Sequence, residues 1–214
     1  MRVILHSDLN NFYASVECLR RPEIRDKPVV VTGAKEDRHG VVLAKNLIAK
    51  AAGVKTGDVY WEARQKCGSS LVEIAADFPE YLRYSKKVRQ IYEDYTDRIE
   101  AFGIDECWLD VTASRKLFGS GEQIAETIRR RVKEELGLTV SVGVSYNKIF
   151  AKLGSDMKKP DAVTVITPEN YRETVWKLPA ADLLYVGAAT RKKLYKLGIN
   201  TIGDLAQANE ELLV

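Results

Sequence analysis

The segment RIEAFGIDECWLDV, residues 98–111, contains two short apolar runs on either side of a glycine. The runs, residues 98–102 and 107–111, have the length and composition of β-strands. Gly103 lies between them and can adopt backbone conformations that a tight turn requires. The segment therefore predicts two strands joined by a turn, and the elements around it decide the fold.

Helices are expected on both sides of these two strands. In residues 79–95 and 121–136, apolar side chains recur every three or four positions, as on one face of an amphipathic helix. Gly137 follows the second segment and is typical of a helix end. The apolar faces consist of Tyr81, Tyr84, Val88, Ile91 and Tyr95 in the first segment and Ile124, Ile128, Val132 and Leu136 in the second.

Two more strands complete the pattern. Residues 3–8 form an apolar run that ends in Asp8, and residues 139–144 alternate between inward and outward positions. In chain order the elements read strand, helix, strand, strand, helix, strand, which is the ferredoxin-like order of an α+β fold. The interval between residues 8 and 79 is long enough for an inserted subdomain.

Composition excludes several classes of protein. The 214 residues are 45% hydrophobic and 29% charged, which excludes a disordered or low-complexity chain, and the net charge of +3 is only weak evidence for a polyanionic partner. Cys18, Cys67 and Cys107 form no C-x-x-C pair, so we expect no disulfide framework or zinc site and a reducing, cytoplasmic location. No apolar run approaches the ~18 residues of a membrane span, so no membrane partner is expected.

Three carboxylates are placed where one site can form. Asp8 ends the first strand, and Asp105 and Glu106 lie at the turn of the central pair, where neighbouring residues can face the same side. Clustered carboxylates repel each other unless cations lie between them, and oxygen ligands suit Mg²⁺. The alternative is that these acids are ordinary turn residues. Asp110 is assigned a structural role.

Other candidates have a functional and a structural interpretation. Phe12 and Tyr13 are either core residues or the wall beside a nucleotide sugar. The lysines around a helix at residues 148–157, Lys148, Lys152, Lys158 and Lys159, are most simply a solvated face. His6 and His39 are expected to pack in the core.

The last part of the chain is expected to consist of short helices. Residues 187–199 contain Arg191, Lys192, Lys193 and Lys196 and no acid, which indicates either a solvated face or sequence-independent DNA contact through backbone N–H groups and cations. Residues 209–214 read as the first turn of a helix, which is too short to be stable alone. We therefore expect the chain to be a fragment of a longer protein.

Three segments resemble the Y-family translesion DNA polymerases, in their DNA polymerase IV and UmuC-like group. They are SDLNNFYASVE (residues 7–17), GIDECWLD (residues 103–110) and SVGVSYNKIFAKLGSDMKKP (residues 141–160). The resemblance covers essentially the whole chain. It implies an α+β fold with a ferredoxin-like palm at residues 1–10 and 77–165, inserted fingers at 11–76 and a helical thumb, truncated, at 166–214.

Several parts and partners follow from the resemblance. The thumb would contain a helix-hairpin-helix that includes residues 187–199, with Gly187, Arg191, Lys192 and Lys193 as DNA contacts. The family's little finger domain would lie beyond Val214 and would be absent from this chain. Any contact with a sliding clamp would be made by the same missing part. The implied activity is that of a template-directed DNA polymerase, a nucleotidyltransferase of lesion bypass and DNA repair. Its partners would be primer-template DNA and deoxynucleoside triphosphates, and its cofactor two Mg²⁺ ions.

The resemblance also assigns roles to single residues. Asp8, Asp105 and Glu106 would be catalytic Mg²⁺ ligands, with the Leu9 carbonyl as a further ligand. The nucleotide would be held by Phe12, Tyr13, Lys50 and Lys159, where Tyr13 would exclude a ribose 2′-hydroxyl and Lys159 would bind the triphosphate.

The chain departs from the family pattern at four positions. Asn10 stands where many members have a second Asp, Leu47 and Lys50 stand where Tyr and Arg are common, and Tyr185 replaces a hairpin glycine.

Two alternatives to a polymerase are a non-catalytic DNA-binding module with a palm-like core and a nucleotidyl cyclase. The three acids argue against the first, and the inserted fingers and basic thumb argue against the second.

Overall fold

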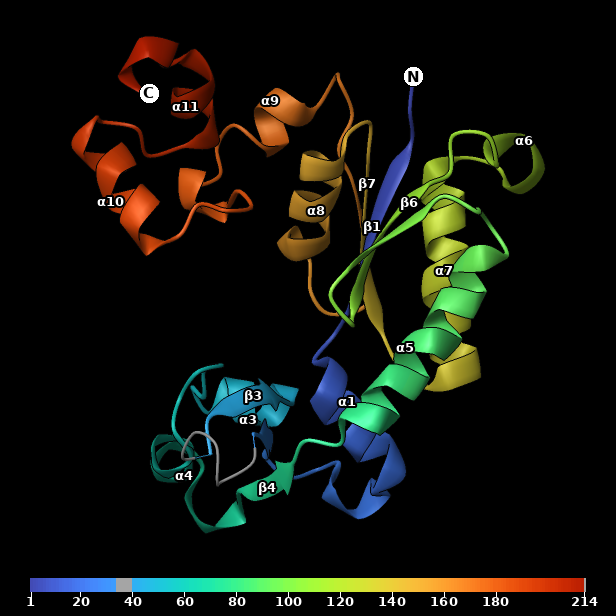
Figure 1. Cartoon of the computed structure of the whole chain (residues 1–214), viewed down its shortest axis with the longest axis vertical. Helices are drawn as coiled ribbons and strands as arrows, with labels where there is room; N and C mark the ends of the chain where they lie inside the picture. The colour runs from blue at the N-terminus through green and yellow to red at the C-terminus, as the bar shows by residue number, and fades with distance from the viewer. Residues whose placement is uncertain (34–39, 214) are drawn as a thin grey trace. The chain divides into compact units, whose positions relative to one another are not determined.

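The computed structural model describes residues 1–33 and 40–213, which form a mixed α+β structure (Figure 1). The chain divides into two units, one made of residues 1–8, 92–130 and 140–214 and the other of residues 9–91 and 131–139. The division into palm, fingers and thumb stays a prediction. None of the helices in the described part of the chain is long and apolar enough to cross a membrane.

The first unit contains a five-stranded sheet in the order β5-β6-β1-β7-β8. Four of its strands were predicted to within one residue at each end, and Gly103, at φ 84°, forms the expected turn between β5 and β6. The fifth, β8, was not predicted because its three residues are too few to show periodicity. The strands are β1 (Ile4–Leu9), β5 (Ile99–Phe102), β6 (Glu106–Asp110), β7 (Val140–Ser145) and β8 (Val163–Val165).

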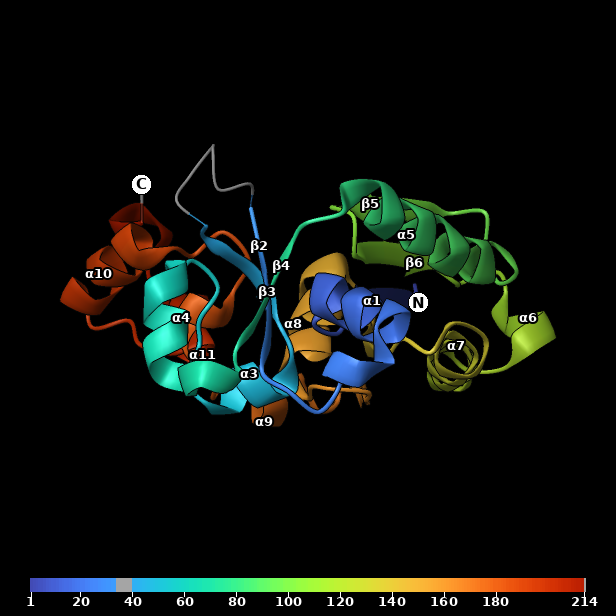
Figure 2. The same cartoon turned by 90° about the horizontal axis from the view of Figure 1, so that it is seen from below.

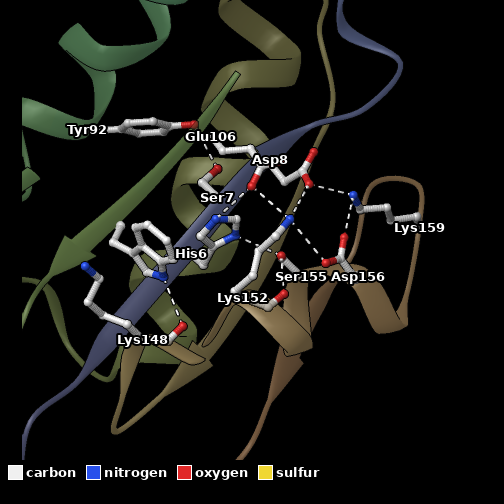
Figure 3. A network of polar contacts seen from close by, with 11 residues as sticks. His6, Ser7, Asp8, Tyr92, Glu106, Lys148, Lys152, Ser155, Asp156 and Lys159 are labelled. Carbon is white, nitrogen blue, oxygen red and sulfur yellow. Dashed lines mark hydrogen bonds and ion pairs between the residues drawn. The ribbon is translucent and has the colours of Figure 1, made fainter. Parts of the chain in front are cut away.

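Helices pack on both faces of this sheet, and the alternation of side chains along β1 separates the two faces. On one face the start of α7 (Gly121–Leu136) lies beside Leu5, and the Tyr92 hydroxyl is 2.8 Å from Ser7 Oγ. On the other face α8 (Lys148–Met157) covers Ile4 and Trp108 through Ala151 (Figure 1). The side chains of His6 and Asp8 therefore point toward α8, as Figure 3 shows.

Short helices fill the rest of the first unit, as the sequence predicts after residue 177. The expected helix at residues 209–214 is instead a single 3-10 turn, in which Asn209 Oδ1 accepts a hydrogen bond from the Glu211 N–H. The short elements are α6 (Arg115–Phe118), α9 (Tyr171–Thr174), η3 (Ala180–Asp182), α10 (Ala188–Lys196), α11 (Ile202–Gln207) and η4 (Glu210–Leu212).

The second unit contains a three-stranded sheet in the order β3-β2-β4, drawn with its helices in Figure 2. This unit is formed mainly by the segment that the sequence analysis expects as an inserted subdomain, and β4 was not predicted. His39 lies outside the described residues. The elements are α1 (Phe12–Arg20), η1 (Pro22–Ile24), β2 (Val29–Thr32), β3 (Val42–Lys45), α3 (Leu47–Ala51), α4 (Tyr60–Cys67), η2 (Gly68–Ser70) and β4 (Val72–Ala75), and α5 (Phe78–Glu93) links the units.

Helix α8 lies unusually close to strand β7 because both contribute a glycine to the contact. A Cβ atom added to Gly143 would lie 1.9 Å from the Ala151 carbonyl oxygen and 2.5 Å from the Ser155 nitrogen, and a Cβ on Gly154 would lie 3.2 Å from Gly143 Cα. Backbone therefore meets backbone, and this fixes the height of α8 above the sheet.

We expect Gly143→Ala to destabilise the fold by about 3 kcal/mol or more, since overpacking against backbone cannot be relieved by side-chain rotation. Gly33→Ala is the matched control, because a Cβ there meets no atom within 4 Å, and it should change the free energy of unfolding by less than about 0.5 kcal/mol. Urea unfolding measures both. Equal stability of the two variants would show that the contact is not restrictive.

Candidate active site

The three predicted acids come from the neighbouring strands β1 and β6. Asp8 lies near the end of β1, and Glu106, the first residue of β6, is its direct cross-strand partner. Cross-strand partners share a face of the sheet and lie within contact distance. Asp105 comes from the turn before Glu106. The register thus brings together residues that are almost one hundred positions apart in the sequence.

Asp105 carries the electrostatic strain of this arrangement. Burial first, and then the negative charges of Asp8 and Glu106, raise its pKa to about 6 against the smaller lowering effect of the nearby Lys152 ammonium. A carboxyl whose ionised form is disfavoured by like charges is a common property of catalytic and metal-binding sites.

Two lysines neutralise the other two acids (Figure 3). Lys152 Nζ is 2.8 Å from Glu106 Oε2, 3.3 Å from Asp8 Oδ2 and 3.2 Å from Asp156 Oδ2. Lys159 Nζ is 2.6 Å from Asp8 Oδ2 and 2.9 Å from Asp156 Oδ1. Burial opposes the charge of Lys152, but pairing with Glu106 and Asp8 outweighs it, so the pKa of Lys152 is raised.

The solvated face expected for these lysines is therefore wrong for Lys152, whose side chain is only 13% exposed. It lies on the side of α8 that faces the sheet. Sequence reasoning missed it because nothing in the spacing of Lys148 and Lys152 separates a lysine turned toward solvent from one turned toward buried acids.

His6 is buried, as expected, but it is more than a core residue. Its Nδ1 is 2.8 Å from Ser155 Oγ, and its Nε2 is 3.1 Å from Glu106 Oε2. Burial opposes ionisation of Glu106, but hydrogen bonding to His6 and Lys152 outweighs it, so the pKa of Glu106 is lowered. The available signal was the strand alternation that places His6 on the same face as Asp8.

The donor set of the cluster suits Mg²⁺, since Asp8, Asp105 and Glu106 offer only carboxylate oxygens. Glu106 Oε2 is buried without an aligned hydrogen-bond partner among the described residues, although His6 Nε2 and Lys152 Nζ lie 3.1 Å and 2.8 Å from it, so the carboxylate has unused acceptor capacity that a nearby cation could draw on. Among the described residues, no three His, Cys, Asp or Glu side chains are gathered as metal ligands, and Lys152 and Lys159 hold the oxygens of Asp8 and Glu106 instead. The residues fit a divalent cation by their chemistry.

The other predicted nucleotide contacts belong to the second unit. Phe12 is buried, as is Leu9, which was predicted as a metal ligand, while Tyr13 is half-buried and its ring stacks on Tyr81 with centroids 4.3 Å apart. Tyr81 in turn donates a 2.9 Å hydrogen bond to the buried Glu17. This chain of contacts fixes the plane of the Tyr13 ring.

Lys50 is exposed on α3, beside the exposed Leu47 that also departs from the family pattern. Its side chain is available to a ligand.

The predicted DNA contacts lie around the start of α10. Gly187 is the residue before this helix, and Arg191, Lys192 and Lys193 are exposed along it. Tyr185, which replaces a hairpin glycine, adopts the left-handed conformation at φ 70° that glycine would adopt without strain, and it is 84% exposed. The backbone at Tyr185 thus has the conformation that the glycine of the predicted hairpin would adopt.

The charge of Asp105 is expected to destabilise the metal-free fold. Between about pH 4 and pH 6 the folded chain holds a proton that the unfolded chain releases, so stability falls as the pH rises through this window. We expect Asp105→Asn to exceed the parent chain in stability by about 1–3 kcal/mol at neutral pH in EDTA. Urea unfolding on either side of the window measures the difference.

Asp110→Asn, at the far end of the strand that follows Asp105, is the matched control. Burial raises the pKa of Asp110, but hydrogen bonds from Thr112 and the Arg2 charge outweigh it and lower the pKa, so its removal should not stabilise the chain. Equal pH dependence of Asp105→Asn and the parent chain would contradict the electrostatic account.

The chain is similar in sequence to curated DNA polymerases. DNA polymerase IV of Acetivibrio thermocellus is 64% identical over 213 residues, which cover 100% of this chain and 53% of the relative. DNA polymerase IV of Pseudomonas aeruginosa is 43% identical over 214 residues, which cover 100% of this chain and 61% of the relative. The chain thus spans little more than half the length of these relatives.

The fold is similar to solved polymerase structures. DinB from Sulfolobus solfataricus matches with a TM-score of 0.88, and an insertion ternary complex of Dbh DNA polymerase matches with a TM-score of 0.91. Both are 30% identical in sequence, and each match covers 99% of this chain and 62% of the solved chain. The sequence pattern of the impB/mucB/samB family matches residues 7–156, a range that contains all three acids and Lys152. The resemblance to Y-family polymerases is therefore confirmed, and the chain belongs to the impB/mucB/samB family.

Proposed function

We propose that the chain is the catalytic region of a template-directed DNA polymerase of the lesion-bypass type. Its β1-α5-β5-β6-α7-β7 core would be a ferredoxin-like palm, residues 11–76 the fingers, and residues 166–214 a thumb with a helix-hairpin-helix. The observation that carries the proposal is the Asp8–Glu106 cross-strand pair with Asp105 in the adjoining turn, in a chain of this family. The reaction would join a primer 3′-hydroxyl to the α-phosphate of a deoxynucleoside triphosphate and release pyrophosphate.

Asp8, Asp105 and Glu106 would hold two Mg²⁺ ions, with the Leu9 carbonyl as an additional ligand. When bound, such ions lower the pKa of the attacking hydroxyl and neutralise the leaving phosphate. The high pKa of Asp105 supports this assignment, because a divalent charge would relieve the repulsion among the three acids.

Lys159, unlike Lys152, would change partners when substrate binds. Lys159 is paired with Asp8 and Asp156 and is the more exposed of the two, with 30% of its side chain accessible. The phosphate oxygens of a triphosphate are also anionic, so Lys159 can pair with them instead once a metal ion neutralises the carboxylate of Asp8. Lys152 is more deeply buried and would stay with Glu106.

The exposed cations Arg191, Lys192 and Lys193 near Gly187 would bind the phosphates of primer-template DNA without reading its sequence. Lys50 would contact the triphosphate as a point charge, since lysine lacks the two-pronged geometry of arginine. A sliding clamp would bind elsewhere in a longer protein. The three free cysteines support the cytoplasm as the site of action.

Asp105→Ala should reduce primer extension by at least about a thousandfold, because one of the metal-binding carboxylates is lost while the fold is retained. The assay is extension of a labelled primer in Mg²⁺ by the chain, with the full-length Acetivibrio thermocellus relative as positive control. Asp110→Asn should extend normally. Retained extension by Asp105→Ala would refute the site.

Tyr13→Ala should admit ribonucleotides, because the ring would no longer meet the 2′-hydroxyl. The ratio of deoxynucleotide to ribonucleotide incorporation should fall by roughly a hundredfold, the effect of about 3 kcal/mol of lost steric discrimination. Tyr13→Phe keeps the ring and should keep the ratio. Unchanged discrimination in Tyr13→Ala would remove Tyr13 from this role.

A further inference from the structure

We propose that His6 is a positioning residue for Glu106: its Nε2–H bonds Glu106 Oε2, the Ser155 hydroxyl bonds Nδ1, and Glu106 Oε1 is thereby presented to a divalent cation. This inference rests on the proposed function, since it concerns the metal ligands of the same site. Packing holds the imidazole in place, its neighbours determine which ring nitrogen carries a proton, and its contact selects one oxygen of Glu106.

The imidazole of His6 lies between strand β1 and helix α8 with no exposure to solvent. Its ring meets Trp108 edge-on with centroids 5.0 Å apart, and Trp108 Nε1 donates a 3.0 Å hydrogen bond to the Lys148 carbonyl. The ring plane is therefore held by packing as well as by its own polar contacts. Figure 3 shows Nε2 directed at Glu106 and Nδ1 directed at Ser155.

The proton on Nε2 follows from its neighbour. A carboxylate oxygen only accepts hydrogen bonds, so a favourable contact with Glu106 requires a proton on Nε2. In the neutral ring Nδ1 is then an acceptor, and Ser155 Oγ, 2.8 Å away, must donate to it. The opposite tautomer would place two lone pairs 3.1 Å apart at Glu106. In a doubly protonated ring Nδ1 would instead donate to Ser155 Oγ, but the Nε2–H contact with Glu106 is the same, so the assignment of Nε2 holds for either charge state.

Ser155 connects the histidine to α8. Its Oγ is also 2.7 Å from the Lys152 carbonyl oxygen, but a hydroxyl has one proton and can donate to one acceptor at a time. Donation to His6 therefore competes with a local bond inside the helix. The residue is fully buried, so no solvent is available to satisfy Nδ1 in its place.

The two polar contacts of Glu106 converge on one oxygen. His6 Nε2 and Lys152 Nζ both approach Oε2, at 3.1 Å and 2.8 Å, which leaves Oε1 to be presented to a cation. Nε2 and Oε2 are each buried without an aligned hydrogen-bond partner in the described part of the chain. A small rotation of the carboxyl group would align them, and a cation drawing on Oε1 would favour that rotation.

The test compares His6→Gln with His6→Asn. The Gln amide nitrogen reaches the position of Nε2, whereas the shorter Asn amide reaches only that of Nδ1, and both variants lose the ring that packs on Trp108. The probe is Mn²⁺ binding to the chain, measured by electron paramagnetic resonance of the free ion, with thermal unfolding as a check of folding. We expect His6→Gln to stay within about threefold of the parent dissociation constant and His6→Asn to weaken binding about tenfold.

A second pair of variants keeps the test open if the histidine variants fold poorly. Ser155→Ala removes the partner of Nδ1 and should weaken Mn²⁺ binding roughly threefold. Ser145→Ala removes another buried hydroxyl, which donates a 2.9 Å hydrogen bond to the Ile166 carbonyl, and should leave binding unchanged.

The outcomes separate this inference from the proposed function. Asp105→Ala should abolish Mn²⁺ binding, and a parent chain that binds no Mn²⁺ through Asp105 would overturn both proposals. Binding that depends on Asp105 but is equal in His6→Gln and His6→Asn, or equal in Ser155→Ala and Ser145→Ala, would overturn the role of His6 alone. A purely structural histidine would lower the unfolding temperature in both substitutions without separating their metal affinities.

Discussion

The cost of gathering negative charge at one end of a sheet governs this structure. Asp8 and Glu106 are cross-strand partners, and Asp105 adjoins them with a raised pKa. Partly buried like charges cannot remain ionised together without cations close to them. The helix α8 and the turn after it supply two, Lys152 and Lys159, and much of the first unit serves to hold that segment above the acids. The fold tolerates the repulsion among the acids because these two lysines offset it.

Lys152 and Lys159 have different parts in this balance. Lys152 has three carboxylate neighbours, Asp8, Glu106 and Asp156, and little exposure, so removing any one of them leaves it paired. Lys159 shares Asp8 and Asp156 but is more accessible to solvent and to ligands. Under the proposed function, Lys152 would stay paired while Lys159 would be released as the charge of the site changes on binding of metal and substrate.

The sequence predicts the strands and the turn that carry the acids better than it predicts the side chains that contact the acids. Strand alternation and the turn at Gly103 were enough to place Asp8, Asp105 and Glu106 at the same end of the sheet. They could not place Lys152, because the direction of a helical side chain depends on how the helix is seated, and that is decided by the distant Gly143. His6 was on the right face but had no visible partner, since Ser155 is almost 150 positions away in the sequence.

The strands that prediction missed have a similar explanation. β8 and β4 contain three and four residues, too few to show a period. They are strands because they pair with β7 and β2 at the edges of their sheets. In contrast, α7 and α8 were predicted to the residue. Their patterns are long and bounded by local signals, such as Asn147, whose side chain accepts a hydrogen bond from the Phe150 N–H at the start of α8.

The glycine contact between β7 and α8 also limits how the site can move. Elements that are separated by a layer of side chains can shear past one another by changing rotamers. Gly143 and Gly154 leave no such layer, so α8 cannot slide along the sheet without backbone collision. Helix α8 is therefore a rigid support, and any adjustment of the site to a ligand has to come from rotamer changes in the side chains of Lys152 and Lys159.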